Sequence, residues 1–497
     1  MLIANRGEIV LRVARTSRKL GLEPCGIYSE ADRESLHLKH CKEAINIGGH
    51  RPSESYLRAD KIIDAAKKLG CDMIHPGYGF LAENLEFTLL CKKEGFIFVG
   101  PSPSAMKLSG DKAKAREVAS RIAPILPGKE ISNESDALDL ANEIGYPVIL
   151  KAVKGGGGRG LRVIESADDL SKAFTSSKNE SMLSFGSDRL YVEKYLLNPR
   201  HIEVQIIGDS NSKVIHLGER DCSIQRRHQK LIEETPSPAL TSDIRAKMVE
   251  KAIGVANEMS YDNAGTVEFL FKDGNFYFME LNSRIQVEHP ITEEVTGIDI
   301  VEQQLHIAMA SGLNIKQEEI KFRGHAIECR INAEHPVTFA PYPGRVTKFI
   351  PPPKNDGIRV DTALYSDYLI PPFYDSLMAK LICHAENRNN AIERMKNSLL
   401  SFRISGIPST IPFHLSALND QQFLRGDYDT DFVNRLKPFA SKAGEISAAL
   451  FSMMPKRTQL LKTEQDNKKD PWLMSRYDDM IFHDGYSDYL SSSSWTR

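Results

Sequence analysis

The sequence predicts a protein of mixed α/β and α+β class, on three observations. Strand and helix patterns alternate through the first 106 residues, a glycine run lies between two strands near residue 155, and a carboxylate-rich hairpin pattern spans 266–290. Alternating strands and helices favour a parallel sheet covered by helices, whereas hairpins favour antiparallel sheets. At 497 residues the chain should form about three domains. We place them at residues 1–106, 107–318 and 319–437, followed by an extra helical and polar tail over 438–497.

The first region is expected to be a Rossmann-like domain. Its candidate strands are LIAN, CGIYS, MIHPGYGF and FIFVG, and its candidate helices are RGEIVLRVARTSRKLG and YLRADKIIDAAKKLG. The first strand–helix turn reads Asn5-Arg6-Gly7-Glu8, which lacks the G-x-G-x-x-G pattern of a dinucleotide site. Two glycines lie within His75–Phe80 after a strand, so this segment is either a ligand-binding turn or simply a tight turn.

A glycine-rich segment follows a strand that ends in a lysine. The strand is Tyr146–Lys151, the glycines are Gly155–Gly158 and Gly160, and the next strand is LRVI. A Rossmann fingerprint needs a helix after its glycines, and no Walker sequence is present, so neither motif is predicted. The pattern indicates a flexible flap whose N–H groups close over phosphates above Lys151. The alternative interpretation is a disordered linker. Upstream, Lys112 opens a helix.

The stretch 266–290 begins as two strands, TVEFLF and NFYFMELN, with a hairpin signal at Asp273-Gly274. Loop length decides which side chains face each other. A two-residue loop would set Glu268 opposite Met279, and a three-residue loop would set it opposite Glu280. We favour the three-residue loop, because its Gly and Asn tolerate the positive φ that such loops need.

Two carboxylates that face each other in a sheet require a cation between them. Asn282 lies on the same face as Glu280 and adds an amide oxygen to the oxygens of Glu268 and Glu280. Such an all-oxygen set suits Mg²⁺ or Mn²⁺ and leaves positions open for phosphate oxygens. The alternative is a half-buried hairpin whose carboxylates are simply solvated.

Beyond the hairpin the chain shows no turn signal before Pro290. If this piece is extended, Arg284, Gln286 and Glu288 share one side. A fixed guanidinium beside a carboxylate suits the binding of an oxyanion next to a base.

Two other stretches place charged side chains among strand-forming residues. The stretch 219–230 interleaves basic and acidic residues, which favours a pocket for small anions over a nucleic-acid patch. Arg330 lies mid-strand in GHAIECRINAE, where a charge is costly unless paired, so it should point into a site. The third domain should continue with strands and helices in GRVTKFIPP, SLMAKLICHAE and NAIERMKNSLLSFRISG.

Composition excludes several classes of function. The chain carries 64 basic and 66 acidic residues, so no nucleic-acid or membrane surface is predicted. No apolar run approaches the roughly 18 residues of a membrane span, and the first residues resemble neither a signal peptide nor a transit peptide. The seven cysteines are scattered without a CxxC pair, which is typical of reduced thiols in a cytoplasmic protein and predicts no zinc site.

Nine segments of the chain resemble one family in this order: IANRGEI, HPGYGFLAEN, GDK, YPVILKAVKGGGGRG, VEKYLLNPRHIEVQ, ERDCSIQRRHQK, TVEFLF, FMELNSRIQVEHP and GHAIECRINAE. Together they resemble the ATP-grasp superfamily, and within it the biotin carboxylases, from about residue 2 to about residue 437. The resemblance implies an ATP-grasp central domain with a mobile glycine-rich flap, and a mixed C-terminal biotin carboxylase domain. Val153 and Ser283 depart from the family's usual residues without removing a catalytic group.

The resemblance also implies roles for individual residues. The residues expected to bind ATP are Lys112, Lys151, Gly155, Gly156, Gly157, Gly158, Glu193, Lys194, Leu196, His201, Gln225, His228 and Leu270. Those expected to hold two Mg²⁺ or Mn²⁺ ions are Glu268, Glu280 and Asn282. Those expected to hold bicarbonate are Arg284, Lys230 and the backbone of Gln286 and Val287. Glu288 would be the base that activates bicarbonate, and Arg330 would stabilise the enolate of biotin.

The implied reaction is the ATP- and bicarbonate-dependent carboxylation of biotin through carboxyphosphate. We expect the biotin on a separate biotin carboxyl carrier protein. The second partner would be a carboxyltransferase subunit, and this chain would form a homodimer in the complex.

This chain is not expected to carry biotin itself. Lys380 follows Met378-Ala379 but lies in a predicted buried strand, and the tail is too short for a biotinyl domain. The aromatic residues of that tail make it the candidate for docking a partner.

Two other functions compete with this one. A carbamoyl-phosphate synthetase type of ligase also phosphorylates bicarbonate, but RRHQK and Arg330 argue against it. An inactive nucleotide sensor is expected to lack a ligand, the base or a lysine, and none is missing. The acceptor stays open between acetyl-CoA, propionyl-CoA, methylcrotonoyl-CoA and pyruvate.

Overall fold

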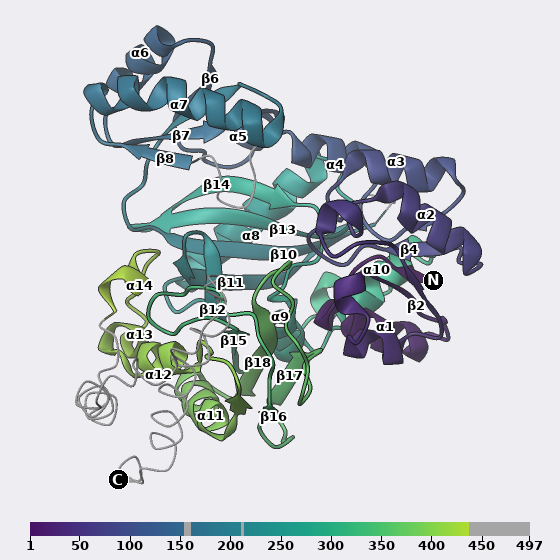
Figure 1. The fold of residues 1–497 in the computed structure, drawn as a ribbon. Helices are drawn as coiled ribbons and strands as arrows, with labels where there is room; N and C mark the ends of the chain where they lie inside the picture. Colours follow the sequence, from purple (N-terminus) through teal and green to yellow (C-terminus); the bar gives the residue numbers. More distant parts are fainter. Residues whose placement is uncertain (154–160, 210–212, 437–497) are drawn as a thin grey trace, which may run out of the picture.

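The computed structural model describes residues 1–153, 161–209 and 213–436. Its N-terminal domain is a parallel five-stranded sheet in the order β3-β2-β1-β4-β5, with α2 and α3 packed on one face and α1 on the other (Figure 1). The predicted Rossmann-like arrangement is thereby confirmed, although the short edge strand β3 was not predicted. The bounds are β1 (Leu2–Ile3), α1 (Glu8–Lys19), β2 (Cys25–Tyr28), β3 (Ala44–Asn46), α2 (Ala59–Lys68), β4 (Met73–His75), α3 (Leu85–Lys93), β5 (Ile97–Phe98) and α4 (Pro103–Gly110).

A small subdomain stands apart above the rest of the molecule in Figure 1. It is an antiparallel four-stranded sheet in the order β6-β9-β7-β8, covered by α6 and α7. The strand that ends near Lys151 pairs with the strand LRVI, as the flap prediction required. The bounds are α5 (Lys112–Ser120), β6 (Gly128–Ile131), α6 (Glu134–Ile144), β7 (Val148–Ala152), β8 (Leu161–Ile164), α7 (Ala167–Phe185) and β9 (Leu190–Lys194).

An eight-stranded antiparallel sheet forms the centre of the molecule, in the order β14-β13-β10-β11-β12-β15-β18-β17. It runs without a break from the predicted second domain into the predicted third, because β12 pairs with β15. Helix α8 packs against β10 and β11, while α9 packs against β11, β12, β15 and β18. The bounds are β10 (Arg200–Gly208), β11 (Val214–Arg226), β12 (Gln229–Thr235), α8 (Ser242–Glu258), β13 (Asn263–Lys272), β14 (Asn275–Asn282), α9 (His289–Thr296), α10 (Ile300–Ala308), β15 (His325–Asn332), β17 (Ile358–Thr362) and β18 (Leu377–Ala385).

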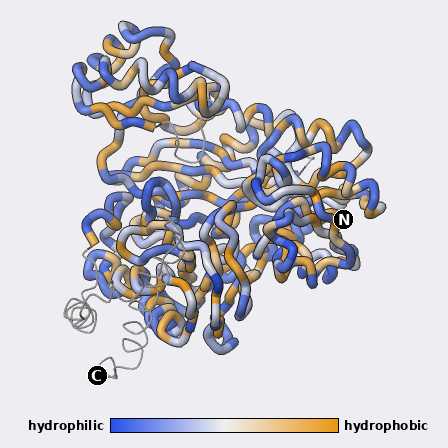
Figure 2. The backbone as a smooth tube through the Cα atoms, in the orientation of Figure 1, coloured by the Kyte–Doolittle hydropathy of each residue, from blue (hydrophilic) through white to orange (hydrophobic). Residues whose placement is uncertain are grey.

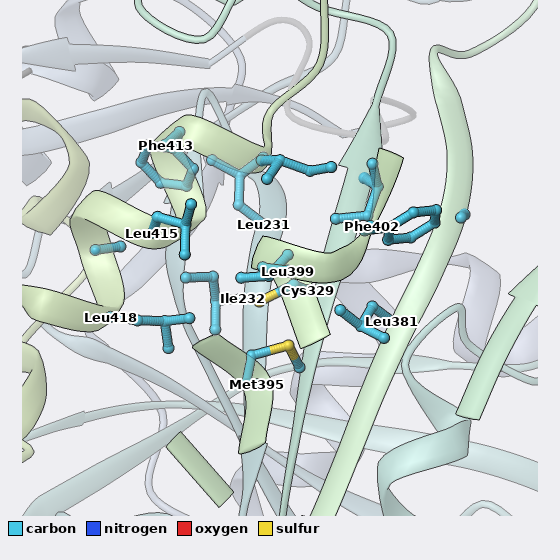
Figure 3. Close-up of a cluster of buried hydrophobic side chains, with 14 of the residues drawn as sticks. Leu231, Ile232, Cys329, Leu381, Met395, Leu399, Phe402, Phe413, Leu415 and Leu418 are labelled. Carbon is cyan, nitrogen blue, oxygen red and sulfur yellow. The ribbon is translucent and has the colours of Figure 1, made fainter. Parts of the chain in front are cut away.

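The C-terminal helices cover the outer face of β12, β15 and β18. Figure 3 shows the core between them, where Cys329 and Leu381 of the strands meet Met395 and Leu399 of α11 and Leu418 of α12. Hydrophobic segments follow the strands, and hydrophilic segments lie along the outer loops and helices (Figure 2). The bounds are β16 (Lys348–Ile350), α11 (Arg388–Ser401), β19 (Arg403–Ser405), α12 (Ile411–Asn419), α13 (Gln421–Arg425) and α14 (Phe432–Arg435). No helix within the described ranges is both long and apolar enough to span a membrane.

The hairpin β13–β14 has the predicted register for a reason that the sequence argument missed. Glu268 faces Glu280, but the loop has two residues, Asp273 and Gly274, which both adopt positive φ. A β-bulge at Met279 then shifts the register by one residue. The choice of a three-residue loop was therefore wrong. Without the bulge, strict alternation would place the phenylalanines of β14 and the carboxylate of Glu280 on the same face.

The segment after β14 is not extended, and this prediction was also wrong. The chain bends near Arg284, turns at Val287 and Glu288, and enters α9 at His289. Pro290 stands in the first turn of this helix instead of ending the element, as its fixed φ and missing N–H allow. Arg284, Gln286 and Glu288 consequently leave the backbone in different directions.

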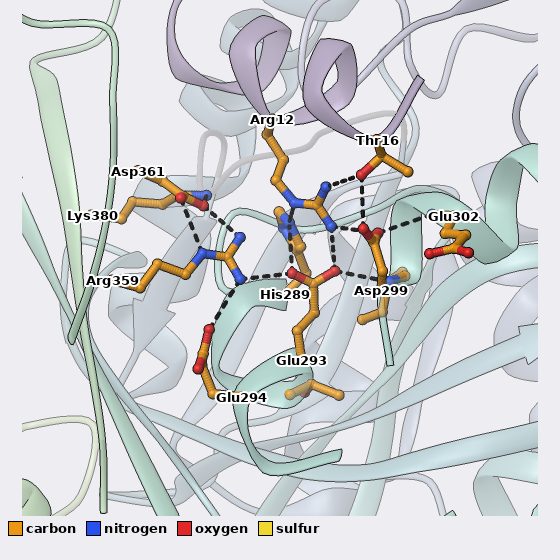
Figure 4. A network of polar contacts seen from close by, with 12 residues as sticks. Arg12, Thr16, His289, Glu293, Glu294, Asp299, Glu302, Arg359, Asp361 and Lys380 are labelled. Carbon is orange, nitrogen blue, oxygen red and sulfur yellow. Dashed lines mark hydrogen bonds and ion pairs between the residues drawn. The ribbon is translucent and has the colours of Figure 1, made fainter. Parts of the chain in front are cut away.

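A buried polar network joins the N-terminal domain to the central sheet (Figure 4). Arg12 of α1 donates to Glu293 of α9 at 2.5 Å and to Asp299 at 2.6 Å. Arg359 of β17 donates to the same Glu293 at 2.8 Å and pairs with Asp361 at 2.7 Å. Glu293 therefore connects a cation of the N-terminal domain with a cation of β17 in the central sheet.

Candidate active site

The ammonium group of Lys230 lies among three carboxylates in the centre of the site. Its Nζ is 2.5 Å from Glu203 Oε2, 2.6 Å from Glu288 Oε1 and 3.2 Å from Glu268 Oε1. Burial alone would lower the pKa of Lys230, but these carboxylates raise it well above its ordinary value. The lysine is therefore charged, and it holds together residues from β10, β12, β13 and the start of α9.

Glu288 is held between two cations. Its second oxygen accepts from Arg330 Nη2 at 2.9 Å, while Arg330 Nε donates to Glu233 at 2.6 Å. Burial would raise the pKa of Glu288, but Lys230 and Arg330 together bring it well below its ordinary value. Glu288 is thus ionised, and the mid-strand charge of Arg330, which was expected to point into a site, is paired.

The direct ion-pair partner of Arg284 is Glu83 and not Glu288. Its Nε is 2.9 Å from Glu83 Oε2, and its Nη2 is 3.4 Å from Asn282 Oδ1. Burial would lower the pKa of Arg284, but Glu83 and also Glu288 raise it, so the two groups interact without forming a direct ion pair. Gln286 donates instead to Glu268 at 2.7 Å.

The predicted metal-ligand set comes together at the open end of the hairpin. Glu268 and Glu280 face each other, and Asn282 follows Glu280 on β14. Protein cations compensate both carboxylates: Lys112 lies 3.3 Å from Glu280, and His201 lies 2.9 Å from Glu268. Two carboxylates and an amide oxygen form a hard donor set, so these residues fit Mg²⁺ or Mn²⁺.

Two further groups of ligand-type side chains lie deeper in the site. They are His201, Glu203 and Glu268, and Glu203, Cys222 and Glu288, with ligand atoms within 4.8 Å of one another. The ammonium of Lys230 already contacts the carboxylates of both groups. We therefore assign no metal ion to this deeper position.

The described residues expected to bind the nucleotide come from α5, the small subdomain and the adjoining strands of the central sheet. Glu193 of β9 pairs with Lys151 at 3.1 Å and with Arg116 at 3.0 Å. Lys194 donates to the carbonyl groups of Gly145 and Tyr146 at 3.0 and 3.1 Å. Gln225 and His228 lie at the β11–β12 turn, Leu196 follows β9, and Leu270 lies on β13 beside His201 of β10. Gly155, Gly156, Gly157 and Gly158 lie outside the described residues, as does the tail over 438–497, so the flap and the docking segment stay predictions.

Sequence reasoning missed several groups that build the site. Glu203 is fully buried, and Arg220 donates to it at 2.5 Å and to Gln286 at 3.0 Å. Arg220, like Arg330, is a charged residue inside a strand, and the same reasoning would have identified it as a candidate site residue.

The turn after β4 is stabilised by Asn5, which donates to the carbonyls of Pro76 and Tyr78, so it is at least a tight turn.

Three family descriptions match successive parts of the chain. Residues 1–106 match "Biotin carboxylase, N-terminal domain", residues 111–316 match "Carbamoyl-phosphate synthase L chain, ATP binding domain", and residues 328–435 match "Biotin carboxylase C-terminal domain". A pyruvate carboxylase subunit of Methanothermobacter thermautotrophicus is 47% identical over 441 residues, 88% of this chain and 90% of that protein. Biotin carboxylase 1 of Bacillus subtilis is 48% identical over 439 residues, 87% of this chain and 97% of that protein.

The chain belongs to the biotin carboxylase family. Its activity is therefore that of an ATP-dependent biotin carboxylase, a ligase within a biotin-dependent carboxylase. The predicted family, fold class and reaction are confirmed. The description that matches the central domain is shared with carbamoyl-phosphate synthases, so the two flanking domains distinguish the chain from that class.

Solved structures of biotin carboxylases have the same fold. A complex from Campylobacter jejuni described with β,γ-ATP superposes with a TM-score of 0.85 at 50% identity, over 87% of this chain and 98% of that one. The biotin carboxylase domain dimer of a Hydrogenobacter thermophilus 2-oxoglutarate carboxylase superposes with a TM-score of 0.85 at 45% identity, over 87% and 96% of the two chains. That second structure was solved with MgADP, ADP and bicarbonate.

Proposed function

We propose that this biotin carboxylase uses Glu288 as the base that activates bicarbonate. The observation that carries the proposal is the position of Glu288, between Lys230 Nζ at 2.6 Å and Arg330 Nη2 at 2.9 Å. Both cations favour the ionised carboxylate, which is the form that can take a proton. The same two cations can then stabilise negative charge that develops beside the carboxylate.

Bicarbonate would bind next to Glu288, held by Arg284, Lys230 and the backbone N–H groups of Gln286 and Val287. Arg284 would exchange the carboxylate of Glu83 for the bicarbonate anion, so one anionic partner replaces another. Glu288 accepts the bicarbonate proton, and the bicarbonate oxygen attacks the γ-phosphate of ATP. The products of this step are carboxyphosphate and ADP.

The nucleotide would lie between the small subdomain and the central sheet. Lys112 and Lys151 provide positive charge for its phosphates, and Glu268, Glu280 and Asn282 would hold two Mg²⁺ or Mn²⁺ ions. When bound, these ions supply charge neutralisation for the transferred phosphoryl group. The residues proposed to contact the nucleotide otherwise are Gly155, Gly156, Gly157, Gly158, Glu193, Lys194, Leu196, His201, Gln225, His228 and Leu270.

Arg330 would act in the second step. Carboxyphosphate breaks down to CO₂ and phosphate, the phosphate removes the N1′ proton of biotin, and CO₂ adds to that nitrogen. Arg330 stabilises the enolate oxygen that forms on biotin in between. Burial alone would lower the pKa of Arg330, but Glu233 and Glu288 raise it well above its ordinary value, so the guanidinium stays charged throughout.

We further propose that biotin arrives on a separate carrier protein, and that the carboxyl group leaves through a carboxyltransferase subunit. Lys380, the Met-flanked candidate, is fully buried in β18 and pairs with Glu8, which argues against its biotinylation. One relative is named as part of a multi-subunit pyruvate carboxylase, and the Hydrogenobacter structure is described as a dimer, which supports a homodimer within a larger complex. All seven cysteines are free thiols, which fits a cytoplasmic location.

Substitution of Arg330 separates the two steps of this proposal. Arg330→Met should lower biotin carboxylation with free biotin by roughly 10²–10³-fold, because a donor to the developing oxyanion is lost. Bicarbonate-dependent ATP cleavage should fall much less. Arg323→Met, at an exposed arginine before β15, is the matched control. Equal loss of both activities would contradict the role of Arg330, and ammonia-dependent carbamate formation would support the competing ligase function.

A further inference from the structure

Two buried carboxylates outside the proposed ligand sets face each other across β12 and β15. Glu233 and Glu328 are directly opposed in the antiparallel ladder, and neither residue is exposed. Glu233 Oε1 accepts from Arg330 Nε at 2.6 Å. The other oxygen of Glu233 and both oxygens of Glu328 have no hydrogen-bond partner in the described part of the chain.

Among the described residues, no cation forms a hydrogen bond or ion pair with Glu328. The charged groups around the two glutamates are Arg330, Lys380, Lys230 and Glu288. Lys380 is occupied by Glu8 at 3.0 Å and by the carbonyl of Val287 at 3.0 Å. Arg330 is divided between Glu233 and Glu288, and Lys230 contacts the three carboxylates at the centre of the site. The titratable groups of the adjoining α9 have other partners: His289 and Glu293 bond to Arg12, and Glu294 bonds to Arg359.

An unpaired ionised carboxylate is too costly to remain buried, so such a group takes up a proton. Burial raises the pKa of Glu328 well above its ordinary value, and the facing Glu233 adds to the rise although Lys380 opposes it. Burial also raises the pKa of Glu233, to about 7, against the lowering effect of Arg330. Two like charges at directly opposed positions would also repel each other strongly, so both cannot be ionised.

We propose that Glu233 and Glu328 share one proton, and that this pair positions Arg330 against Glu288. Protonated Glu328 supplies an O–H donor, and the free oxygen of Glu233 can accept it. Glu233 then stays ionised and keeps its hydrogen bond from Arg330, so the guanidinium bonds to both Glu233 and Glu288. The shared proton follows from the buried pair itself, whereas its use in catalysis rests on the proposed role of Arg330.

The pair would make the positioning of Arg330 depend on pH. Above about pH 7 Glu233 is ionised and holds Arg330. As the pH falls through this value, Glu233 takes a proton of its own and the ion pair with Arg330 is lost. Glu288 is then the only remaining carboxylate partner of Arg330 within the described structure. Biotin carboxylation should therefore decline on the acid side of neutrality.

Infrared spectroscopy of the full chain tests the shared proton without any assay of activity. A protonated carboxyl group absorbs as a carbonyl, separately from an ionised carboxylate. At about pH 8, above the transition of Glu233, we expect a buried-acid band in the wild-type protein that Glu328→Gln lacks. Glu386→Gln, at an exposed glutamate after β18, should keep the band. Absence of the band from the wild-type protein would overturn the proposal, whether or not the variants fold.

The pH profile of biotin carboxylation tests the positioning. Glu233→Gln should lower kcat about 10- to 100-fold and leave the KM for ATP unchanged, because Arg330 loses the carboxylate that positions it. The decline of activity below about pH 7, the acid limb of the profile, should also disappear. Glu328→Gln should leave the midpoint of the limb unchanged, because one neutral group replaces another. A midpoint that moves to lower pH in Glu328→Gln would show an ionised Glu328 in the wild-type protein and overturn the proposal. An inactive wild-type protein that keeps the infrared band would contradict the proposed function alone.

Discussion

At the scale of single residues, the site is a set of buried ions that compensate one another. Lys230 contacts three carboxylates, and Arg220 and Arg330 contact two of the same carboxylates from other directions. Each charge is stable inside the protein only while its partners remain. A substrate anion that enters this set must therefore exchange partners with a carboxylate already present.

Replacement of the proposed base tests this residue-scale description. Glu288→Gln should reduce bicarbonate-dependent ATP cleavage by roughly 10²–10⁴-fold, because the amide cannot accept the proton. Binding of the nucleotide with Mg²⁺, measured by calorimetry, should survive. The exposed Glu386→Gln serves as the control. An activity of Glu288→Gln within a few-fold of wild type would remove Glu288 from the role of base.

At the scale of elements, the bulge at Met279 reconciles the two faces of β14. Phe276 and Phe278 pack in the core beside α8, while Glu280 and Asn282 belong to the predicted metal set on the other face. Strict alternation would have put all four side chains on one face. One extra residue resets the alternation, so apolar and polar positions each reach the correct side.

The bulge predicts opposite outcomes for losing and gaining one residue. Deletion of Met279 should give a regular hairpin that still opposes Glu268 to Glu280, so the thermal unfolding midpoint should stay close to that of wild type. Insertion of one alanine before Glu280 should turn Glu280 and Asn282 toward the core and prevent stable folding. Circular dichroism melting of both variants distinguishes the outcomes. If the deletion unfolds the protein and the insertion does not, our account of the bulge is wrong.

Elements with strong local patterns could be predicted from the sequence, and those set by distant contacts could not. The amphipathic helix α2 and the mid-strand Arg330 carried their own signals. The turn into α9 gave no local signal, because Pro290 fits the first turn of a helix as well as it ends a strand. The partner of Arg284 is Glu83 from another domain, and no spacing along the chain indicates that contact.

At the scale of the whole molecule, one buried carboxylate joins the central sheet to the C-terminal helices. Glu234 of β12 accepts from His325 at 2.6 Å, from Arg388 at 2.7 and 2.9 Å, and from Tyr428 at 2.5 Å. Burial would raise the pKa of Glu234, but His325 and Arg388 lower it to about 2. This lowered pKa means that the ionised carboxylate contributes to the stability of the folded chain.

Removal of that charge should destabilise the protein in a pH-dependent way. Glu234→Gln should cost about 3–5 kcal/mol near neutral pH, because three donors lose their anionic partner. The wild-type contribution is complete above the ordinary pKa of 4.5 and is lost as the pH falls toward about 2. Urea midpoints of wild type and variant should therefore converge over this range. A difference that does not change with pH would contradict the assignment.

Lys380 belongs to β18 of the C-terminal region, yet its ammonium group contacts Glu8 of the N-terminal domain at 3.0 Å and the carbonyl of Val287, next to the proposed base, at 3.0 Å. Recombination between related enzymes meets a constraint here. A chimaera that takes its first domain from one parent and its last from another must inherit a matching acid and amine at this junction. Crossover points between two parents are therefore better chosen so that the Glu8–Lys380 pair is kept. In a library of chimaeras, the fraction that folds should fall as the fraction with a mismatched pair at these two positions rises.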